Sequence, residues 1–208
     1  MNIGKACITG LLLFVALLLP AACSTTPRLP LLASDAAILA FGDSLTAGTG
    51  AGETESYPAV LSQMTGRKVI NAGIPGEVSA AGAQRLPELL DQLRPALVIL
   101  CHGGNDLLAR QDHRFIADNL RAMIRMSVER GIPVLLIAVP TPDLMLKPPP
   151  LYENLAGEFR LPVELKALPH ILGRSSLKSD HIHPNAAGYR MLAESLVRLL
   201  KKSGALSP

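Results

Sequence analysis

The residues best suited to chemistry in this sequence are a serine, a histidine and an aspartate that lie far apart along the chain. Ser44 stands in "GDSLTAGTG", a cluster of small residues that follows an apolar run. A serine hydroxyl is a weak nucleophile at neutral pH, and it needs a base, a group that orients the base, and donors for the oxyanion. The stretch "SDHIHPN" supplies a candidate base, His183, and a candidate orienting group, Asp180, three residues before it.

Each of these residues also has an ordinary structural interpretation. A serine between a strand and a cluster of glycines is typical of a turn or a helix cap. Asp180 or Asn185 can cap the last helix, which would leave His183 as a surface histidine. His181 lies inside the same stretch, but the Asp-x-x-His spacing favours His183 as the base. The chemical interpretation therefore requires that separate segments converge in the fold.

Two further loops offer donors for an oxyanion. Gly73 has a main-chain N–H with no side chain to obstruct a substrate, and Asn105 has a side-chain amide with two N–H groups. The N–H of Ser44 is a third candidate. The alternatives are a turn glycine at 73 and a loop-capping asparagine at 105. We expect the neighbouring carboxylates, Asp43 and Asp106, to brace their loops.

The remaining polar and sulfur-containing residues receive structural interpretations. Cys101 is expected to be buried at a strand end, and His102 is expected to be structural, with a place at the site as the alternative. His113 and His170 are expected on the surface. The "HIH" stretch has no further ligands near it in sequence, so neither a metal site nor a cofactor is expected.

Apolar runs alternate with helical patterns along most of the chain, as expected for a parallel sheet covered on both faces. Pro87 is expected to break the second helix or to restart it. Residues 141–174 are expected to form an irregular segment with a short helix and a short fifth strand. The main predicted elements are strands at 36–41, 68–73, 96–104 and 132–140, and helices at 57–66, 79–93, 115–131 and 184–204.

This alternation predicts a doubly wound α/β fold, in which sites lie beyond the carboxyl ends of the strands. The loops that leave those ends read "GDSLTAGTG", "NAGIPGE", "CHGGNDL" and "VPTPD". Three of the four are rich in Gly, Asn, Asp and Ser. The predicted topology therefore collects the candidate residues at one edge of the sheet.

Four sequence blocks, "FGDSLTAG", "NAGIPGE", "GGND" and "DHIHP", occur in this order. Together they resemble the blocks of the SGNH hydrolases, or GDSL esterases/lipases, and especially the lysophospholipase L1-like thioesterases and arylesterases. The resemblance covers 36–202 and implies a flavodoxin-like three-layer α/β/α sandwich with about five parallel strands. It implies Ser44 as the nucleophile, His183 as the base and Asp180 as its partner. It also implies an oxyanion hole made by Gly73, Asn105 and the Ser44 main chain.

The resemblance implies a serine esterase that acts on acyl, aryl, lysophospholipid or acyl-thioester substrates through an acyl-enzyme. We expect Leu144, Met145, Leu146 and Leu151 to line the substrate pocket, although they can instead cover the sheet edge. Aromatic residues make up 3% of the chain and there is no tryptophan, which disfavours a sugar platform. The alternatives are an O-acetylesterase that acts on cell-envelope glycans and a non-catalytic envelope lipoprotein.

The N-terminus has the pattern of a secretory signal, with Lys5, an apolar run, and small residues after Pro20. "LPAAC" resembles a bacterial lipobox, which would make Cys23 the lipidated first residue and anchor the protein to a membrane. The alternative is simple cleavage, which gives a soluble periplasmic or a secreted protein. We therefore expect export, with the chain divided into a signal peptide, a tether and one hydrolase domain, at 1–23, 24–35 and 36–204.

Composition narrows the class of partner. The 208 residues carry a formal net charge of +3 with both signs scattered along the chain, so nucleic-acid binding is not expected. Of the three cysteines, two lie in the signal segment or at its end, which excludes a disulfide framework in the domain. The expected partner is a small-molecule ester or lipid substrate.

Overall fold

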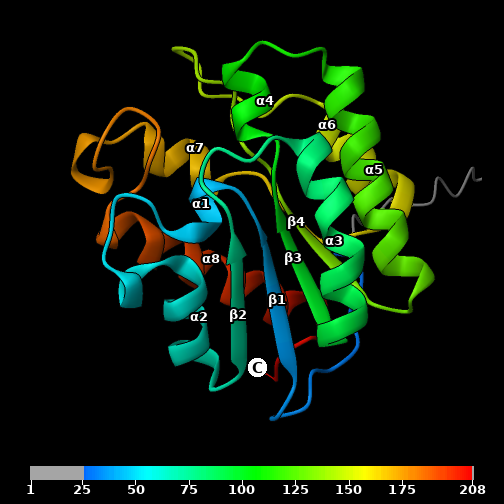
Figure 1. Ribbon diagram of the computed structural model, residues 1–208. Coiled ribbons are helices and arrows are strands. Elements are labelled where there is room, and N and C mark those ends of the chain that lie inside the picture. Colours follow the sequence, from blue (N-terminus) through cyan, green and yellow to red (C-terminus); the bar gives the residue numbers. More distant parts are fainter. Residues whose placement is uncertain (1–25, 208) are drawn as a thin grey trace, which may run out of the picture.

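The computed structural model describes residues 26–207, so Cys23 and the predicted signal peptide lie outside the described residues. A single sheet of five parallel strands has the order β2-β1-β3-β4-β5, and Figure 1 labels the first four of these strands. The predicted doubly wound α/β fold is therefore confirmed. The strands are β1 (Ala37–Gly42), β2 (Lys68–Gly73), β3 (Leu97–Cys101), β4 (Val134–Ile137) and β5 (Val163–Glu164).

Helices cover both faces of the sheet (Figure 1). One layer contains α3 (Ser79–Leu93), α5 (His113–Glu129) and α6 (Leu151–Phe159). The other contains α2 (Tyr57–Thr65), α7 (Ala167–Leu172) and α8 (Ala186–Ser203). The short elements in the loops are α1 (Ser44–Ala47), η1 (Glu53–Glu55), α4 (Gly104–Leu108) and η2 (Ser175–Leu177).

The central strands are continuous apolar runs because they are buried on both faces. Every residue of β3 and β4 is buried. The register places Gly42 of β1 beside Gly73 of β2 on one side and Cys101 of β3 on the other. The loops that follow these three strands therefore leave the sheet at the same level, and this positions the candidate site.

The structure corrects the prediction for Pro87. Helix α3 runs from Ser79 to Leu93 without a break, and Pro87 lies inside it. A proline removes one intrahelical hydrogen bond, but Leu86 and Leu90 on either side are fully buried in the core. Packing of Leu86 and Leu90 in the core therefore stabilises the helical turn around Pro87, which backbone propensity alone disfavours.

Two boundaries also differ from expectation. The last helix begins at Ala186, because Asn185 is its N-cap and accepts from the Gly188 N–H at 3.1 Å. The later part of the predicted tether packs on the domain. Its Leu29 and Leu32 N–H groups donate to main-chain oxygens at the end of α8 and just beyond it, at Ser203 (2.8 Å) and Ala205 (2.9 Å).

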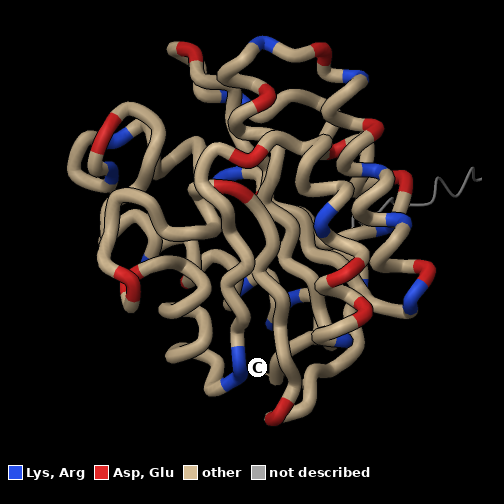
Figure 2. Tube along the Cα trace, viewed as in Figure 1, with Lys and Arg blue, Asp and Glu red and all other residues tan. Residues whose placement is uncertain are grey.

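Figure 2 shows Lys and Arg interspersed with Asp and Glu along the chain, without a basic stripe. Within residues 26–207, no helix combines the length and apolar character that crossing a membrane requires.

Candidate active site

Ser44 is the first residue of α1, directly beyond the carboxyl end of β1. The cap of this short helix is Asp43, whose Oδ1 accepts from the Leu45 N–H at 3.0 Å. The helix ends at Gly48, which has a left-handed conformation with φ of 96°. Asp43 therefore takes the capping role that the sequence left open for Ser44, and the serine side chain is free for another role.

The structure brings the three separated residues into one hydrogen-bonded line. His183 Nε2 lies 3.1 Å from Ser44 Oγ, and His183 Nδ1 lies 2.7 Å from Asp180 Oδ2. An ionised carboxylate only accepts hydrogen bonds, so Nδ1 carries the proton and Nε2 presents its lone pair to the serine. This is the arrangement in which an imidazole can act as a base toward Ser44.

The segment that carries Asp180 folds on itself around the carboxylate. Asp180 Oδ1 accepts from the main-chain N–H groups of Ile182 and His183, both at 2.8 Å. Burial raises the pKa of Asp180, but the His183 side chain and the two N–H groups together outweigh it and lower the pKa to about 2. The carboxylate is therefore charged throughout the neutral range.

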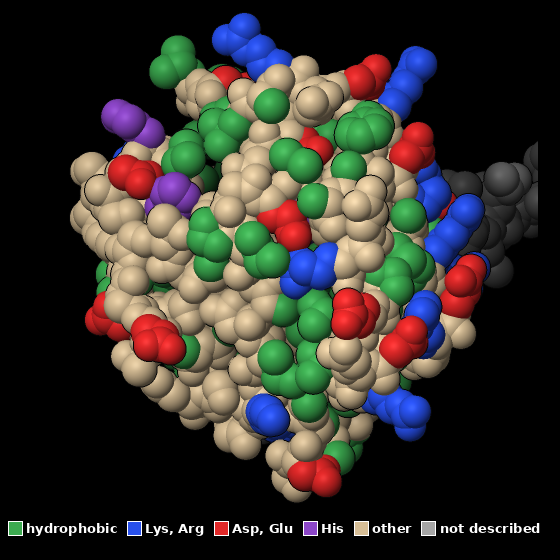
Figure 3. All heavy atoms as spheres, viewed as in Figure 1, with side chains coloured by type: hydrophobic (Ala, Val, Ile, Leu, Met, Phe, Trp, Pro, Cys, Tyr) green, Lys and Arg blue, Asp and Glu red, His purple; other side chains and the backbone are tan. Residues whose placement is uncertain are grey.

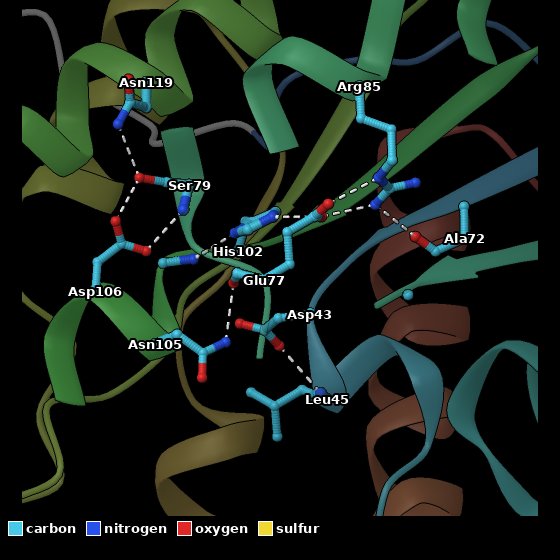
Figure 4. A network of polar contacts seen from close by, with 12 residues as sticks. Asp43, Leu45, Ala72, Glu77, Ser79, Arg85, His102, Asn105, Asp106 and Asn119 are labelled. Atoms are coloured by element: carbon cyan, nitrogen blue, oxygen red, sulfur yellow. Dashed lines mark hydrogen bonds and ion pairs between the residues drawn. The ribbon is translucent and has the colours of Figure 1, made fainter. Parts of the chain in front are cut away.

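Asn105 lies opposite, on α4, beyond the end of β3. One N–H of its side-chain amide donates to the main-chain oxygen of Glu77 at 2.9 Å, as Figure 4 shows. The amide nitrogen has a second hydrogen, and Asn105 lines the same groove as Ser44. The amide is thus fixed in orientation with one donor to spare.

Gly73 is held differently from the other predicted site residues. Its N–H donates to the side-chain oxygen of Asn71 at 3.0 Å. A Cβ at Gly73 would lie 2.1 Å from the main-chain nitrogen of Ala47, so glycine is needed here for close approach to α1. Gly73 is not among the residues that line the groove.

A second glycine of the same block, Gly76, was missed by the sequence analysis. It is exposed and has φ of 80°, and a Cβ there would meet no atom within 4 Å. Among the described residues, neither the Gly76 N–H nor the Ser44 N–H has a hydrogen-bond partner. The sequence signal was present in "NAGIPGE", but it does not tell which of the two glycines has a free N–H.

A partly buried polar network lies behind the Asn105 side of the site (Figure 4). Arg85 and His102 both contact the carboxylate of Glu77. His102 is fully buried and does not line the groove, which agrees with its predicted structural role. Neither Arg85 nor Glu77 was predictable as a site residue, because nothing in the local sequence pattern links them.

Both neighbouring aspartates are buried, as expected for residues that brace loops. Asp106 accepts from the Ser79 hydroxyl at 2.7 Å and from the Ser79 N–H at 2.8 Å, and Asn119 donates to the same hydroxyl at 3.0 Å. Asp43 Oδ2 has no partner within the described part of the chain. Burial is the main cause that raises the pKa of Asp43.

The groove beside Ser44 is largely apolar. Figure 3 shows hydrophobic side chains gathered next to the histidines near the carboxyl end of the sheet. Of the four leucine and methionine positions predicted for the pocket, Leu146 lines the groove. Leu144 and Met145 point into solvent, and Leu151 packs in the core instead. The apolar lining residues are Leu45, Leu108, Val139, Pro140, Pro142, Leu146, Leu172 and Ile182.

The other singled-out residues lie away from this groove, apart from one. Cys101 is buried at the end of β3, and His113 and His170 are exposed. His181 lines the groove, but Asp180 contacts His183 and not His181. The contacts to Asp180 and Ser44 are therefore made by His183, the histidine that the Asp-x-x-His spacing favours as the base.

Comparison with known proteins places this architecture in a family. The GDSL-like Lipase/Acylhydrolase family profile matches residues 40–191. An arylesterase of Vibrio mimicus is 30% identical over 179 residues, covering 79% of this chain and 88% of that protein. The thioesterase 1/protease 1/lysophospholipase L1 of Escherichia coli (strain K12) is 30% identical over 176 residues, covering 79% and 83%.

A solved structure agrees with the sequence matches. The psychrotrophic esterase EstA from Pseudoalteromonas sp., crystallised with monoethylphosphonate as inhibitor, superimposes with a TM-score of 0.71 at 25% identity. The match covers 81% of this chain and 98% of that one. The chain therefore belongs to the GDSL-like lipase/acylhydrolase family and is a serine hydrolase that acts on ester bonds.

Proposed function

We propose that this protein hydrolyses carboxylic esters through an acyl-enzyme formed on Ser44. The observation that carries the proposal is the unbroken line from Ser44 Oγ through His183 to Asp180, with separations of 3.1 and 2.7 Å. Both separations are within the range for hydrogen bonds that transfer or orient a proton. This geometry supports the roles of nucleophile, base and orienting group for the three residues.

In the first half of the reaction, Ser44 Oγ attacks the ester carbonyl carbon and His183 Nε2 takes the hydroxyl proton. The carbonyl oxygen becomes an oxyanion. The Asp180 carboxylate stabilises the imidazolium through Nδ1. When the bond from carbon to the leaving oxygen breaks, His183 returns the proton to that oxygen, and an alcohol leaves.

In the second half, water takes the place of the alcohol. His183 accepts a proton from the water as its oxygen attacks the acyl-enzyme carbonyl. The bond to Ser44 Oγ then breaks, the serine recovers its proton, and the carboxylic acid leaves. No cofactor takes part in this scheme.

The oxyanion hole consists of Asn105 and two main-chain N–H groups, those of Ser44 and Gly76. We assign the role to Gly76 rather than to Gly73, because the Gly73 N–H is already engaged by Asn71. Gly76 directly precedes Glu77, whose main-chain oxygen lies 2.9 Å from the Asn105 amide. A glycine with φ of 80° presents its N–H there without a side chain to obstruct the substrate.

The chemistry of the groove favours esters with an acyl or aryl group of some length. Leu146, Val139 and Leu172 form part of an apolar wall beside Ser44. Each methylene removed from water contributes about 0.8 kcal/mol to binding of such a chain. An acetyl group would use little of this surface.

Hydrolysis of p-nitrophenyl esters of increasing chain length tests the proposal, with the Ser44→Ala variant as the control. We expect turnover that rises from acetate to medium or long chains and disappears in the variant. Activity confined to the acetate ester would contradict the longer acyl or aryl substrate and would indicate an O-acetylesterase. Activity that persists in the variant would overturn the assignment of Ser44.

Export of the protein, with lipidation at Cys23 and anchoring to the outer membrane, is proposed from the sequence alone. The supporting pattern is the apolar run that Lys5 precedes, followed by "LPAAC". The intact mass of the mature protein purified from membranes tests this proposal. A lipid-modified Cys23 at the N-terminus would support it, and an unmodified N-terminus would favour simple cleavage.

A further inference from the structure

We propose that Arg85, Glu77 and His102 are positioning residues that set the geometry of the oxyanion hole. None of them contacts the reacting atoms. They act through the main chain of Glu77, which holds the Asn105 amide in place. The proposal rests on the proposed function, in which Asn105 and the Gly76 N–H stabilise the oxyanion.

Arg85 ties together the loop after β2. Its Nε and a terminal nitrogen donate to the two carboxylate oxygens of Glu77 at 2.8 and 2.7 Å. The same terminal nitrogen donates to the main-chain oxygen of Ala72 at 3.0 Å. The guanidinium also stacks over Phe41, 4.2 Å from the ring centre. Arg85 therefore links both ends of the loop that contains Gly76.

His102 fixes the Glu77 carboxylate from the opposite side. Its Nδ1 accepts from the Gly103 N–H at 3.0 Å, so the proton of the neutral ring lies on Nε2. Nε2 lies 3.1 Å from Glu77 Oε2 and donates to it. The His102 main-chain oxygen accepts from the Tyr152 hydroxyl at 2.9 Å. The ring is fully buried and cannot turn away from Glu77 without breaking the contacts of its two nitrogens.

Glu77 connects this anchor to the reaction. Its side chain is only 6% exposed, so the carboxylate contacts are shielded from water. Burial raises the pKa of Glu77, but the hydrogen bonds from Arg85 and His102 outweigh it and leave the pKa below its usual range. The contacts of the Glu77 carboxylate with Arg85 and His102 fix Glu77 in place. The main-chain oxygen of Glu77 then fixes the Asn105 amide by accepting its hydrogen bond.

An oxyanion donor contributes to the rate only when it points at the place where charge develops. A displacement of about 1 Å can lower a rate by about a hundredfold. Loosening the loop around Gly76 and Glu77 would let the Asn105 amide and the Gly76 N–H move together. The expected defect is therefore in turnover rather than in substrate binding.

The test compares Arg85→Gln with a matched control, Arg130→Gln. Arg130 makes a similar two-point contact with Asp91, at 2.7 and 3.1 Å, on the exposed surface away from the groove. We expect Arg85→Gln to lower kcat for a p-nitrophenyl ester by about tenfold or more while KM stays within about twofold. The control should leave both constants unchanged.

A double-mutant comparison separates positioning from general support of the fold. If Arg85 acts through the oxyanion hole, its loss should lower kcat several-fold less in an Asn105→Ala background than in the parent protein. A merely structural role would give the same fold-change in both backgrounds. Glu77→Gln serves as a second variant, since it keeps the main-chain oxygen and weakens the side-chain anchor.

The outcomes are distinguishable from failure of the proposed function. If Ser44→Ala abolishes activity while Arg85→Gln and Glu77→Gln retain full kcat, the esterase stands and the positioning role is overturned. An equal fold-change in kcat in the parent protein and in the Asn105→Ala background would overturn the positioning role too. If circular dichroism shows that both variants lose the folded state, the network serves stability alone, and the proposal is overturned as well.

Discussion

The base side of the active site and its oxyanion side differ in how the fold holds them. On the base side, Asp180 and His183 lie three residues apart on one surface segment, and the Asp180 side chain is 51% exposed. On the oxyanion side, Asn105 is held by Glu77, which is anchored in turn by Arg85 and His102. Those contacts are largely shielded from water.

The base side and the oxyanion side should therefore respond differently to substitution. A local segment orients its own side chains through short-range hydrogen bonds, such as those from the Ile182 and His183 N–H groups to Asp180. A distributed network depends on residues from several elements at once. Damage to the base side should therefore impair the proton transfers that His183 carries out, whereas damage to the network should alter several oxyanion donors together.

The largest expected effect is on the nucleophile that both sides serve. Ser44→Ala should lower kcat for p-nitrophenyl esters by about 10,000-fold or more, because the proposed acyl-enzyme forms on the Ser44 hydroxyl. The thermal midpoint should change little, since Asp43 provides the helix cap. Steady-state rates per mole of purified protein would check this, and a reduction below a hundredfold would contradict it.

On the oxyanion side, Asn105→Ala should lower kcat by about 100- to 1,000-fold. The side chain donates a hydrogen bond to the reacting oxygen only as charge develops there, so KM should change less than kcat. Steady-state kinetics across the ester series would measure both constants. Unchanged turnover would remove Asn105 from the mechanism.

Much of this arrangement was predictable from the sequence because the relevant signals are local. Continuous apolar runs alternating with helical patterns predicted the parallel sheet, and the parallel register explains why its loops converge. Asp180 and His183 share one short stretch, so their spacing already indicated a pair. The Asp-x-x-His spacing also separated His183 from His181.

The rest depended on contacts between distant positions. Arg85 and His102 lie 8 and 25 residues from Glu77 in sequence, and no pattern of apolar residues encodes such polar pairs. Pro87 was interpreted from backbone propensity, which the buried leucines around it override. The sequence indicated Gly73 and not Gly76 as the oxyanion donor, since the engagement of the Gly73 N–H by Asn71 is visible only in three dimensions.

A pair of substitutions sharpens the distinction between the two glycines. Gly73→Ala should lower the free energy of unfolding by about 1–3 kcal/mol, because the new methyl group meets main-chain atoms of α1. Gly76→Ala has open space and should lower it by about 1–2 kcal/mol through its positive φ alone.

Activity tests the assignment of Gly76 directly. Per folded molecule, Gly76→Ala should reduce kcat although its new methyl group meets no atom, because strain at the positive φ reorients the N–H. Gly73→Ala should reduce kcat only as far as its methyl group displaces α1, which carries Ser44. Urea unfolding gives the stability of each variant, and active-site titration gives the concentration to which kcat is normalised. Full kcat in Gly76→Ala would return the oxyanion role to Gly73.

The smallest expected effect concerns the base side and its dependence on pH. The folded-state pKa of Asp180 falls from its ordinary value of 3.8 to about 2. The ionised carboxylate therefore contributes stability that is present above about pH 4 and is lost as the pH falls toward 2. The side chain is half exposed, so this contribution is small and weakens in salt.

Comparison of the parent protein with Asp180→Asn at several pH values would measure this contribution. The difference in the free energy of unfolding should be greatest near pH 7 and should narrow as the pH falls below about 4. A difference that grows on acidification would contradict the assignment of the lowered pKa.

Covalent labelling tests the central claim most directly. A p-nitrophenyl phosphonate ester should transfer its phosphorus to the serine that the site activates, with release of p-nitrophenolate. Peptide mapping by mass spectrometry should then find one adduct, on Ser44, and none in the Ser44→Ala protein. An adduct on another residue, or no adduct in a protein that hydrolyses esters, would contradict the account.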